Sequence, residues 1–133
     1  MDISQGHIPS ASEALILLAH GSRDPRWAEP FAAIRARVAA ALPATPVVLA
    51  YLETMQPDLA AAVSAVRDHG ARGVCVVPLF LGQGGHVRDD VPRSVAELAR
   101  RYPEVSLRVA GAAGEAPEVL DAIAAYCIAQ GQR

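Results

Sequence analysis

The sequence alternates four times between a strand pattern and a helix pattern, and this alternation constrains the fold more than any other feature. Short apolar runs rich in branched side chains predict strands covered on both faces; these runs are residues 15–19, 47–52, 74–81 and 105–110. Apolar residues three or four positions apart predict a helix after each run; these helices begin near Asp24-Pro25, Gln56-Pro57, Asp90 and Pro117. Strands separated by helices of this length pair in parallel through right-handed crossovers. We therefore expect an α/β fold, a single small doubly wound domain with a four-stranded parallel sheet flanked by helices.

The 133 residues suit one domain, which we place at residues 14–130, after a disordered or frayed start at residues 1–13. All twelve cationic side chains are arginine, and the formal net charge is -2. Proteins that bind nucleic acid in general need a basic footprint, so this balance argues against such a partner. The apolar runs are shorter than the ~20 residues of a membrane helix, and the start lacks the pattern of a signal peptide. We expect a soluble cytoplasmic protein with no membrane partner.

The two cysteines, Cys75 and Cys127, each sit inside an apolar run and form no CxxC pair. Both are therefore predicted to be small buried side chains without a disulfide, as suits a reducing cytoplasm. The last predicted helix aligns Cys127 with Val119, Leu120 and Ile123. Such an apolar face is typical of a helix that packs on a core.

The polar residues that follow each strand are the candidates for chemistry, because ligands of an open parallel sheet bind outside the carboxyl ends of its strands. His20 follows the first predicted strand, Glu53 ends the second, and His86 follows the third. Two imidazoles and a carboxylate are common ligands of divalent metals and leave coordination positions open. The sequence therefore predicts a metal site with room for a substrate, whereas His7 and His69 are expected to have other roles.

The glycines after the third predicted strand, including Gly84 and Gly85, allow a flat ligand to approach the main chain. The sequence has neither a phosphate-binding GxxxxGK[ST] or GxGxxG loop nor a GxSxG nucleophile elbow. Ser22 is accordingly expected to cap a helix or contact a ligand rather than act as a nucleophile. Asp89 and Asp90 are expected to cap the third helix, with a role in metal entry as the alternative.

Three segments resemble the small CbiX-type sirohydrochlorin chelatases, which are related to SirB and CbiK within the class II chelatases. The segments are LLAHGSRDP at the first strand, YLE at the second and VVPLFLGQGGHVRDDVP at the third, and the resemblance runs from about Leu15 to Tyr126. It implies an enzyme, a lyase that inserts Co2+, Fe2+ or Ni2+ into sirohydrochlorin on the routes to cobalamin, siroheme or a related tetrapyrrole. It also implies a chelatase-like or flavodoxin-like fold, a homodimer, and a divalent metal that is a substrate rather than a permanently bound cofactor.

The family's two metal-binding histidines fall on His20 and His86, and its active-site acid falls on Glu53. A neutral imidazole binds a metal or takes a proton, and a carboxylate accepts protons that leave the pyrrole nitrogens. We expect these three residues to be catalytic, with the two histidines also as metal ligands. Which histidine is the base and which is the ligand stays open.

A polycarboxylate tetrapyrrole needs hydrogen-bond donors at the rim of its cleft. The expected substrate contacts come from the segments that carry the two histidines; they are Ser22, Arg23, Arg26, Gly84, Gly85 and Arg88. Arginine suits this task because its guanidinium stays charged and binds a carboxylate in a fork.

Two other functions fit the same pattern. One is a non-catalytic protein that binds or transfers a metal or a tetrapyrrole on the same fold. The other is a flavodoxin-like regulatory or anion-binding domain in which both histidines are structural. Accelerated metal insertion into sirohydrochlorin separates the enzyme from both.

Overall fold

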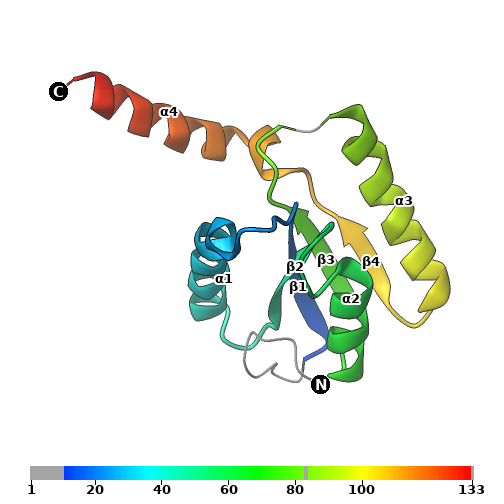
Figure 1. Cartoon of the computed structure of the whole chain (residues 1–133). Coiled ribbons are helices and arrows are strands. Elements are labelled where there is room, and N and C mark those ends of the chain that lie inside the picture. The colour runs from blue at the N-terminus through cyan, green and yellow to red at the C-terminus, as the bar shows by residue number, and fades with distance from the viewer. Residues whose placement is uncertain (1–10, 83, 133) are drawn as a thin grey trace.

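The computed structural model describes residues 11–82 and 84–132, without the side chain of His86. The predicted alternation of strands and helices is confirmed (Figure 1). In chain order the elements are β1 (Glu13–Ala19), the 3-10 turn η1 (Pro25–Ala28), α1 (Glu29–Ala41), β2 (Val47–Tyr51), α2 (Leu59–Asp68), β3 (Gly73–Pro78), α3 (Gly85–Arg101), β4 (Ser106–Val109), the 3-10 turn η2 (Ala113–Glu115) and α4 (Pro117–Gly131).

The sheet has four parallel strands in the order β2-β1-β3-β4. The chain moves outward from β1 to β2 in one direction and then from β3 to β4 in the other, so the strand order reverses between β1 and β3. The amide of Leu79 donates to the carbonyl of Leu18 over 2.7 Å, which continues the pairing of these two central strands to their carboxyl ends. A reversal of this kind opens a crevice at the carboxyl edge of a parallel sheet, and ligands bind there.

The two faces of the sheet are covered unequally (Figure 1). On one face, α2 and α3 pack through residues such as Val63 and Leu98 against a fully buried stripe that includes Ile16 and Val76. On the other face, α1 and η1 cover a smaller cluster around Leu17. The doubly wound fold is thus confirmed, with two helices on the first face and one on the second.

α3 begins at Gly85, five residues before the start predicted near Asp90. Its N-cap is Gly84, so the prediction that Asp89 and Asp90 cap this helix is wrong. The glycine-rich segment before His86 has low helix propensity, and the proline at position 92 favours a start just before it, so the sequence pattern placed the helix too late.

The outer strand β4 is covered on one face only, which corrects the prediction that all four strands are buried on both faces. Leu107 and Val109 pack toward α3, whereas Ser106 and Arg108 are exposed. α4 also has no buried residue, and Cys127 on it is exposed, contrary to the prediction of a buried thiol. Cys75 in β3 is buried as predicted.

The N-terminal prediction of a frayed start falls mostly on residues 1–10, which lie outside the described residues. The carbonyl of Ser12 accepts hydrogen bonds from the amides of Arg72 and Gly73, and β1 starts at Glu13, one residue before the predicted domain. The boundaries 14–130 stay a prediction. None of the helices within the described ranges has both the length and the apolar run that a membrane crossing requires.

Candidate active site

His20 and Glu53 lie at the carboxyl edge of the sheet, one after β1 and the other after β2. The two strands keep pairing past their ends, because the amide of Leu52 donates to the carbonyl of Ala19 over 2.9 Å. The amide of Glu53 then donates to the carbonyl of His20 over 3.1 Å. The main chain itself therefore holds the predicted histidine and the predicted acid side by side.

Gly21 makes this close approach of the two loops possible. Its φ is +99°, in the left-handed region that residues with a Cβ rarely adopt. A Cβ at this position would overlap the carbonyl oxygen of Glu53, which is a backbone atom and cannot rotate away. The glycine that follows His20 is thus required for the geometry, a role that its place after the strand did not indicate.

The imidazole of His20 is supported on one side and open on the other. Its ring lies against Phe80, with 4.5 Å between the ring centroids and an interplanar angle of 36°. Phe80 lies two residues after the end of β3 and is 2% exposed, so it offers a fixed surface. His20 itself is exposed, and it lines the cavity described next.

A cavity of about 540 Å³ opens between His20 and one face of α3. Its lining is His20, Leu52, Glu53, Val87, Asp90, Val91, Arg93, Ser94 and Glu97. The contributions of α3 recur three or four residues apart, the spacing of one helix face. Asp90 is paired with Arg93 over 3.1 Å, which leaves Glu53 and Glu97 to give the cavity a negative bias that favours a divalent cation.

The described residues do not assemble a complete metal site. No three of their histidine, cysteine, aspartate and glutamate side chains are grouped so that they could hold an ion. His86 lies in the first turn of α3, at the same edge as His20, but its side chain is outside the described part. The described contribution to the site is therefore one imidazole, His20, with the carboxylate of Glu53 nearby.

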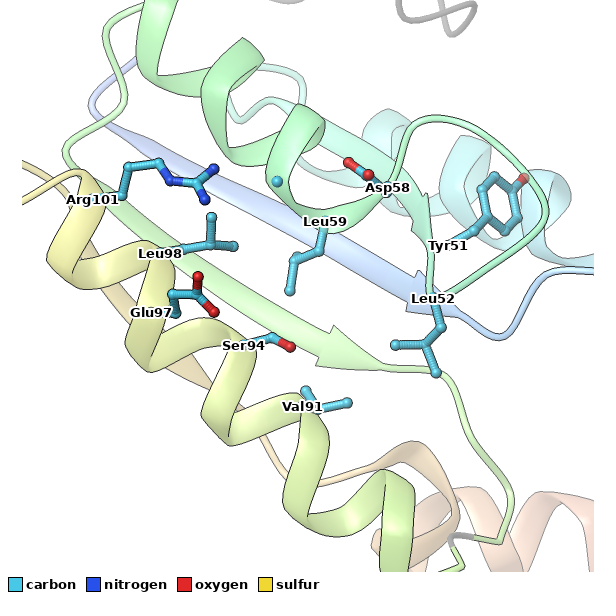
Figure 2. Close-up of a pocket in the computed structure, with 10 residues that line it drawn as sticks. Tyr51, Leu52, Asp58, Leu59, Val91, Ser94, Glu97, Leu98 and Arg101 are labelled. Carbon is cyan, nitrogen blue, oxygen red and sulfur yellow. The ribbon is translucent and has the colours of Figure 1, made fainter.

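A second, smaller cavity of about 230 Å³ continues from the first along the groove between α2 and α3 (Figure 2). Leu52, Ser94 and Glu97 line both cavities, and Arg101 lies at the far end. The ring of Tyr51 points away from this groove, toward Trp27 on the other face of the sheet, with 6.4 Å between the centroids. Burial raises the pKa of the Tyr51 phenol, so it stays protonated at neutral pH.

The predicted substrate contacts after β1 are held by a local hydrogen-bonded turn. The hydroxyl of Ser22 accepts from the amide of Asp24 over 3.1 Å. Asp24 caps η1 and accepts two hydrogen bonds from the guanidinium of Arg26, at 3.1 and 2.9 Å, which hold the pKa of Asp24 below its usual value. Arg23 is exposed. Arg26 is thus engaged with Asp24, although its side chain stays 83% exposed.

The predicted contacts after β3 lie at the start of α3. Gly84 is the N-cap and Gly85 the first helical residue, and a Cβ on Gly84 would meet no other atom. Arg88 lines a third cavity, of about 340 Å³, together with Gly111 and Glu115 on the side of α3 that faces the end of β4. The structure therefore does not place Arg88 in the cavity that contains His20. Because α3 begins earlier than predicted, Arg88 lies within the helix and not in a loop. The helix therefore sets the direction of its side chain.

Comparison with known proteins decides the family, because the profile of the CbiX family matches residues 14–128, most of the chain. The chain belongs to the CbiX family. Among solved structures, a CbiX protein from Marinobacter aquaeolei VT8 is 33% identical, with a TM-score of 0.81 over 91% of this chain and 98% of that one. SirB from Bacillus subtilis subspecies spizizenii in complex with cobalt is 30% identical, with a TM-score of 0.68 over 84% of this chain and 48% of that one.

Curated relatives of this CbiX-family chain include sirohydrochlorin ferrochelatases and sirohydrochlorin cobaltochelatases. The sirohydrochlorin ferrochelatase of Bacillus subtilis (strain 168) is 28% identical over 84% of this chain and 42% of the relative. The sirohydrochlorin cobaltochelatase of Methanocaldococcus jannaschii is 35% identical over 61% of this chain and 57% of the relative. The chain thus spans about half the length of the curated relatives that it matches.

Proposed function

We propose that this CbiX-family chain is a chelatase that inserts a divalent metal, Co2+, Fe2+ or Ni2+, into sirohydrochlorin. The observation that carries the proposal is the position of His20, which is stacked on Phe80, open to solvent, and joined through its main chain to Glu53 at the crevice of the sheet. The names of the relatives, which include ferrochelatases and cobaltochelatases, support this substrate. The products would serve cobalamin, siroheme or related tetrapyrrole synthesis.

In this proposal the metal is a substrate and no cofactor is permanently bound. Insertion exchanges the water and protein ligands of the ion for four pyrrole nitrogens, and two pyrrole protons leave. The neutral imidazole of His20 presents the ion or takes a proton, His86 provides the second imidazole, and Glu53 accepts a proton or balances charge. A site with few protein ligands releases its ion readily, which transfer to the tetrapyrrole requires.

We assign the carboxylates of the substrate to donors at the rim of the crevice. Arg23 and Arg26 extend from the segment after His20, and the first turn of α3, at Gly84 and Gly85, presents backbone amides of the kind that bind anions. Ser22 and Arg88 complete the proposed set. Arg26 forms an ion pair with Asp24. It therefore binds the substrate either while this ion pair is kept or after the ion pair breaks.

Two further parts of the proposal concern the state of the protein. Both cysteines, Cys75 and Cys127, carry free thiols, as in proteins of a reducing compartment, and we propose a cytoplasmic location. We also propose a homodimer, which the resemblance to short CbiX-type chelatases implies.

The experiment that tests the function is anaerobic incubation of the purified protein with sirohydrochlorin and each of the three metals, followed by absorbance. We expect faster appearance of the metallated product than in the same mixture without protein, for at least one metal. If no metal gives a rate above the spontaneous one, the chelatase proposal is wrong and the regulatory or carrier alternatives stand.

Replacing Glu53 with glutamine is expected to lower the insertion rate about 10-fold or more, because an amide cannot accept a proton as the carboxylate does. The fold should be retained, since the contacts of Glu53 with His20 and Met55 are made by its main chain. Initial rates at saturating metal measure the effect. Glu104→Gln is the matched control, because Glu104 pairs with Arg67 away from the crevice and should keep the wild-type rate. Equal rates for wild type and Glu53→Gln would remove Glu53 from the mechanism.

A further inference from the structure

Arg93 lines the cavity that contains His20, although no motif of the sequence pointed to it. Among the described residues that line this cavity, it carries the one guanidinium group. Its side chain is largely exposed, so it reaches the solvent side of the cavity. A guanidinium stays charged at neutral pH and binds a carboxylate in a fork. Arg93 is therefore placed to meet an anionic ligand as it enters the cavity.

The turn of α3 separates Arg93 from Arg88. The two arginines are five residues apart, so their side chains leave the helix in directions about 140° apart. Arg88 lines the third cavity, near Gly111, whereas Arg93 lines the cavity of His20. A molecule bound at His20 therefore meets Arg93 before it meets Arg88.

The charge of the cavity creates a requirement that Arg93 meets. The acidic residues of its lining are Glu53, Asp90 and Glu97. Carboxylates in a cavity attract a divalent cation but repel an anion. The proposed substrate is a polycarboxylate, so a tetrapyrrole that approaches His20 needs a cation on this side of the crevice. Arg93 supplies that cation.

The ion pair between Arg93 and Asp90 is of a kind that exchanges easily. Nη1 of Arg93 donates to Oδ1 of Asp90 over 3.1 Å. The two side chains are 74% and 45% exposed, and an ion pair this open to water contributes little to stability. The hydrogen bond uses one N–H group of the guanidinium, and the others are available for a bidentate contact. A substrate carboxylate can therefore take the place of Asp90 without loss of the fold.

Arg93 lies on the side of the sheet opposite to Arg26. α3 shares one face of the sheet with α2, whereas η1, which carries Arg26, packs through Trp27 on the other face (Figure 1). His20 lies at the edge between these two faces. Sirohydrochlorin has carboxylate side chains around its whole rim, so a macrocycle centred over His20 reaches arginines on both sides of the sheet.

We propose that Arg93 binds a carboxylate of the tetrapyrrole on the α3 side of the crevice, in exchange for Asp90, and so holds the macrocycle across the edge of the sheet above His20. Arg93 then binds and orients the substrate and takes no part in proton transfer. The proposal rests on the proposed function and names one contact that selects a polycarboxylate. A tetrapyrrole without a carboxylate on this side is expected to bind more weakly.

Binding of metal-free sirohydrochlorin tests this contact without turnover. The change in its fluorescence on titration with the full chain, under anaerobic conditions and without metal, gives a Kd for each variant. We expect Arg93→Gln to raise the Kd about 10-fold or more, because a charge-assisted contact is lost. Arg93→Lys should lie between this variant and the wild type, because an ammonium keeps the charge but not the fork. Arg100→Gln is the matched control, since it removes the same charge from an exposed position near the end of α3 and should keep the wild-type Kd.

The outcomes of this titration separate the contact of Arg93 from the proposed function. A wild type that does not bind sirohydrochlorin would overturn both. A wild type that binds, together with equal Kd values for Arg93→Gln and Arg100→Gln, would overturn the role of Arg93 and leave the chelatase proposal intact. Both arginines are exposed, so we expect folded variants, which circular dichroism checks.

Replacing Asp90 with asparagine tests the exchange of partners. We expect the Kd to fall about two-fold, because Arg93 no longer has a competing carboxylate. In an Arg93→Gln background the same replacement should leave the Kd unchanged, since no guanidinium remains to be released. An equal gain in both backgrounds would mean that Asp90 acts through the overall charge of the cavity, and it would overturn the exchange.

Steady-state kinetics separate binding from catalysis. Arg93→Gln should raise the KM for sirohydrochlorin about as much as it raises the Kd, with a kcat within about two-fold of the wild type. A fall in kcat at an unchanged KM would contradict a role in binding and would overturn the proposal.

Discussion

Replacing His20 with alanine is expected to lower the rate of metal insertion by a factor of about 10²–10⁴, while the protein stays folded. His20 is the one imidazole at the crevice whose ring the structure describes, and its loss removes both a metal ligand and a proton acceptor. The side chain is exposed and contacts chiefly the ring of Phe80, so its removal should change the free energy of unfolding by less than about 1 kcal/mol. Insertion kinetics and a urea unfolding curve measure the two effects separately.

The matched control for His20→Ala is His69→Ala. His69 caps the end of α2, with its Nδ1 2.9 Å from the carbonyl oxygen of Ala65, and α2 ends at the amino edge of the sheet, away from the crevice. We expect this variant to insert metal at the wild-type rate, even if its stability falls. If His20→Ala kept the rate of the control, the crevice at β1 would not be the site of metal insertion.

Replacing Gly21 with alanine is expected to reduce both stability and activity. The residue holds a φ of +99°, and the added Cβ would meet the main-chain oxygen of Glu53, so the two loops must separate. We expect the free energy of unfolding to fall by about 2–3 kcal/mol, the cost of a strained backbone position with a steric conflict. Because the loops carry His20 and Glu53, the folded fraction should also insert metal more slowly than the wild type.

Gly111→Ala is the control for this substitution, since a Cβ on Gly111 meets no atom and its φ is not in the left-handed region. Its stability should stay within about 0.5 kcal/mol of the wild type. Urea unfolding of the three proteins gives the comparison. A Gly21→Ala variant as stable as Gly111→Ala would mean that the approach of the two loops is not as tight as the structure describes.

The fold was predictable because the spacing of apolar residues along the sequence indicates each strand and each helix separately. The four strand runs and the helices between them correspond to β1–β4 and α1–α4, and the parallel order follows from the length of the crossovers. The start of α3 was not predictable, because Gly84 and Gly85 have low helix propensity and tertiary packing of Val91 and Leu98 overrides it. The exposure of α4 and Cys127 was also not predictable. A row of apolar residues on a helix indicates that the helix is covered, but it does not say which surface covers it.

The edge of the sheet that carries the site was predictable from the residues after each strand, but its details were not. Gly21 acts through its positive φ, and Phe80 acts through its contact with the ring of His20. A search for polar residues after each strand finds neither of them. Glu97 reaches the same cavity as His20 because α3 passes the crevice, which the spacing of Asp90, Arg93 and Glu97 on one helix face would have indicated. The cavity that Arg88 lines could not be predicted either, because it depends on where α3 begins.

The most direct test of the central claim is the number of sirohydrochlorin molecules metallated by each protein molecule. Anaerobic reactions contain sirohydrochlorin and Co2+ in large excess over the protein, and absorbance of the metallated product is followed to completion, with the spontaneous reaction subtracted. The proposed chelatase predicts many product molecules per protein and loss of this turnover in His20→Ala. Product that stops at one molecule per site, or a rate equal to that without protein, would contradict the claim and identify a binding or transfer protein instead.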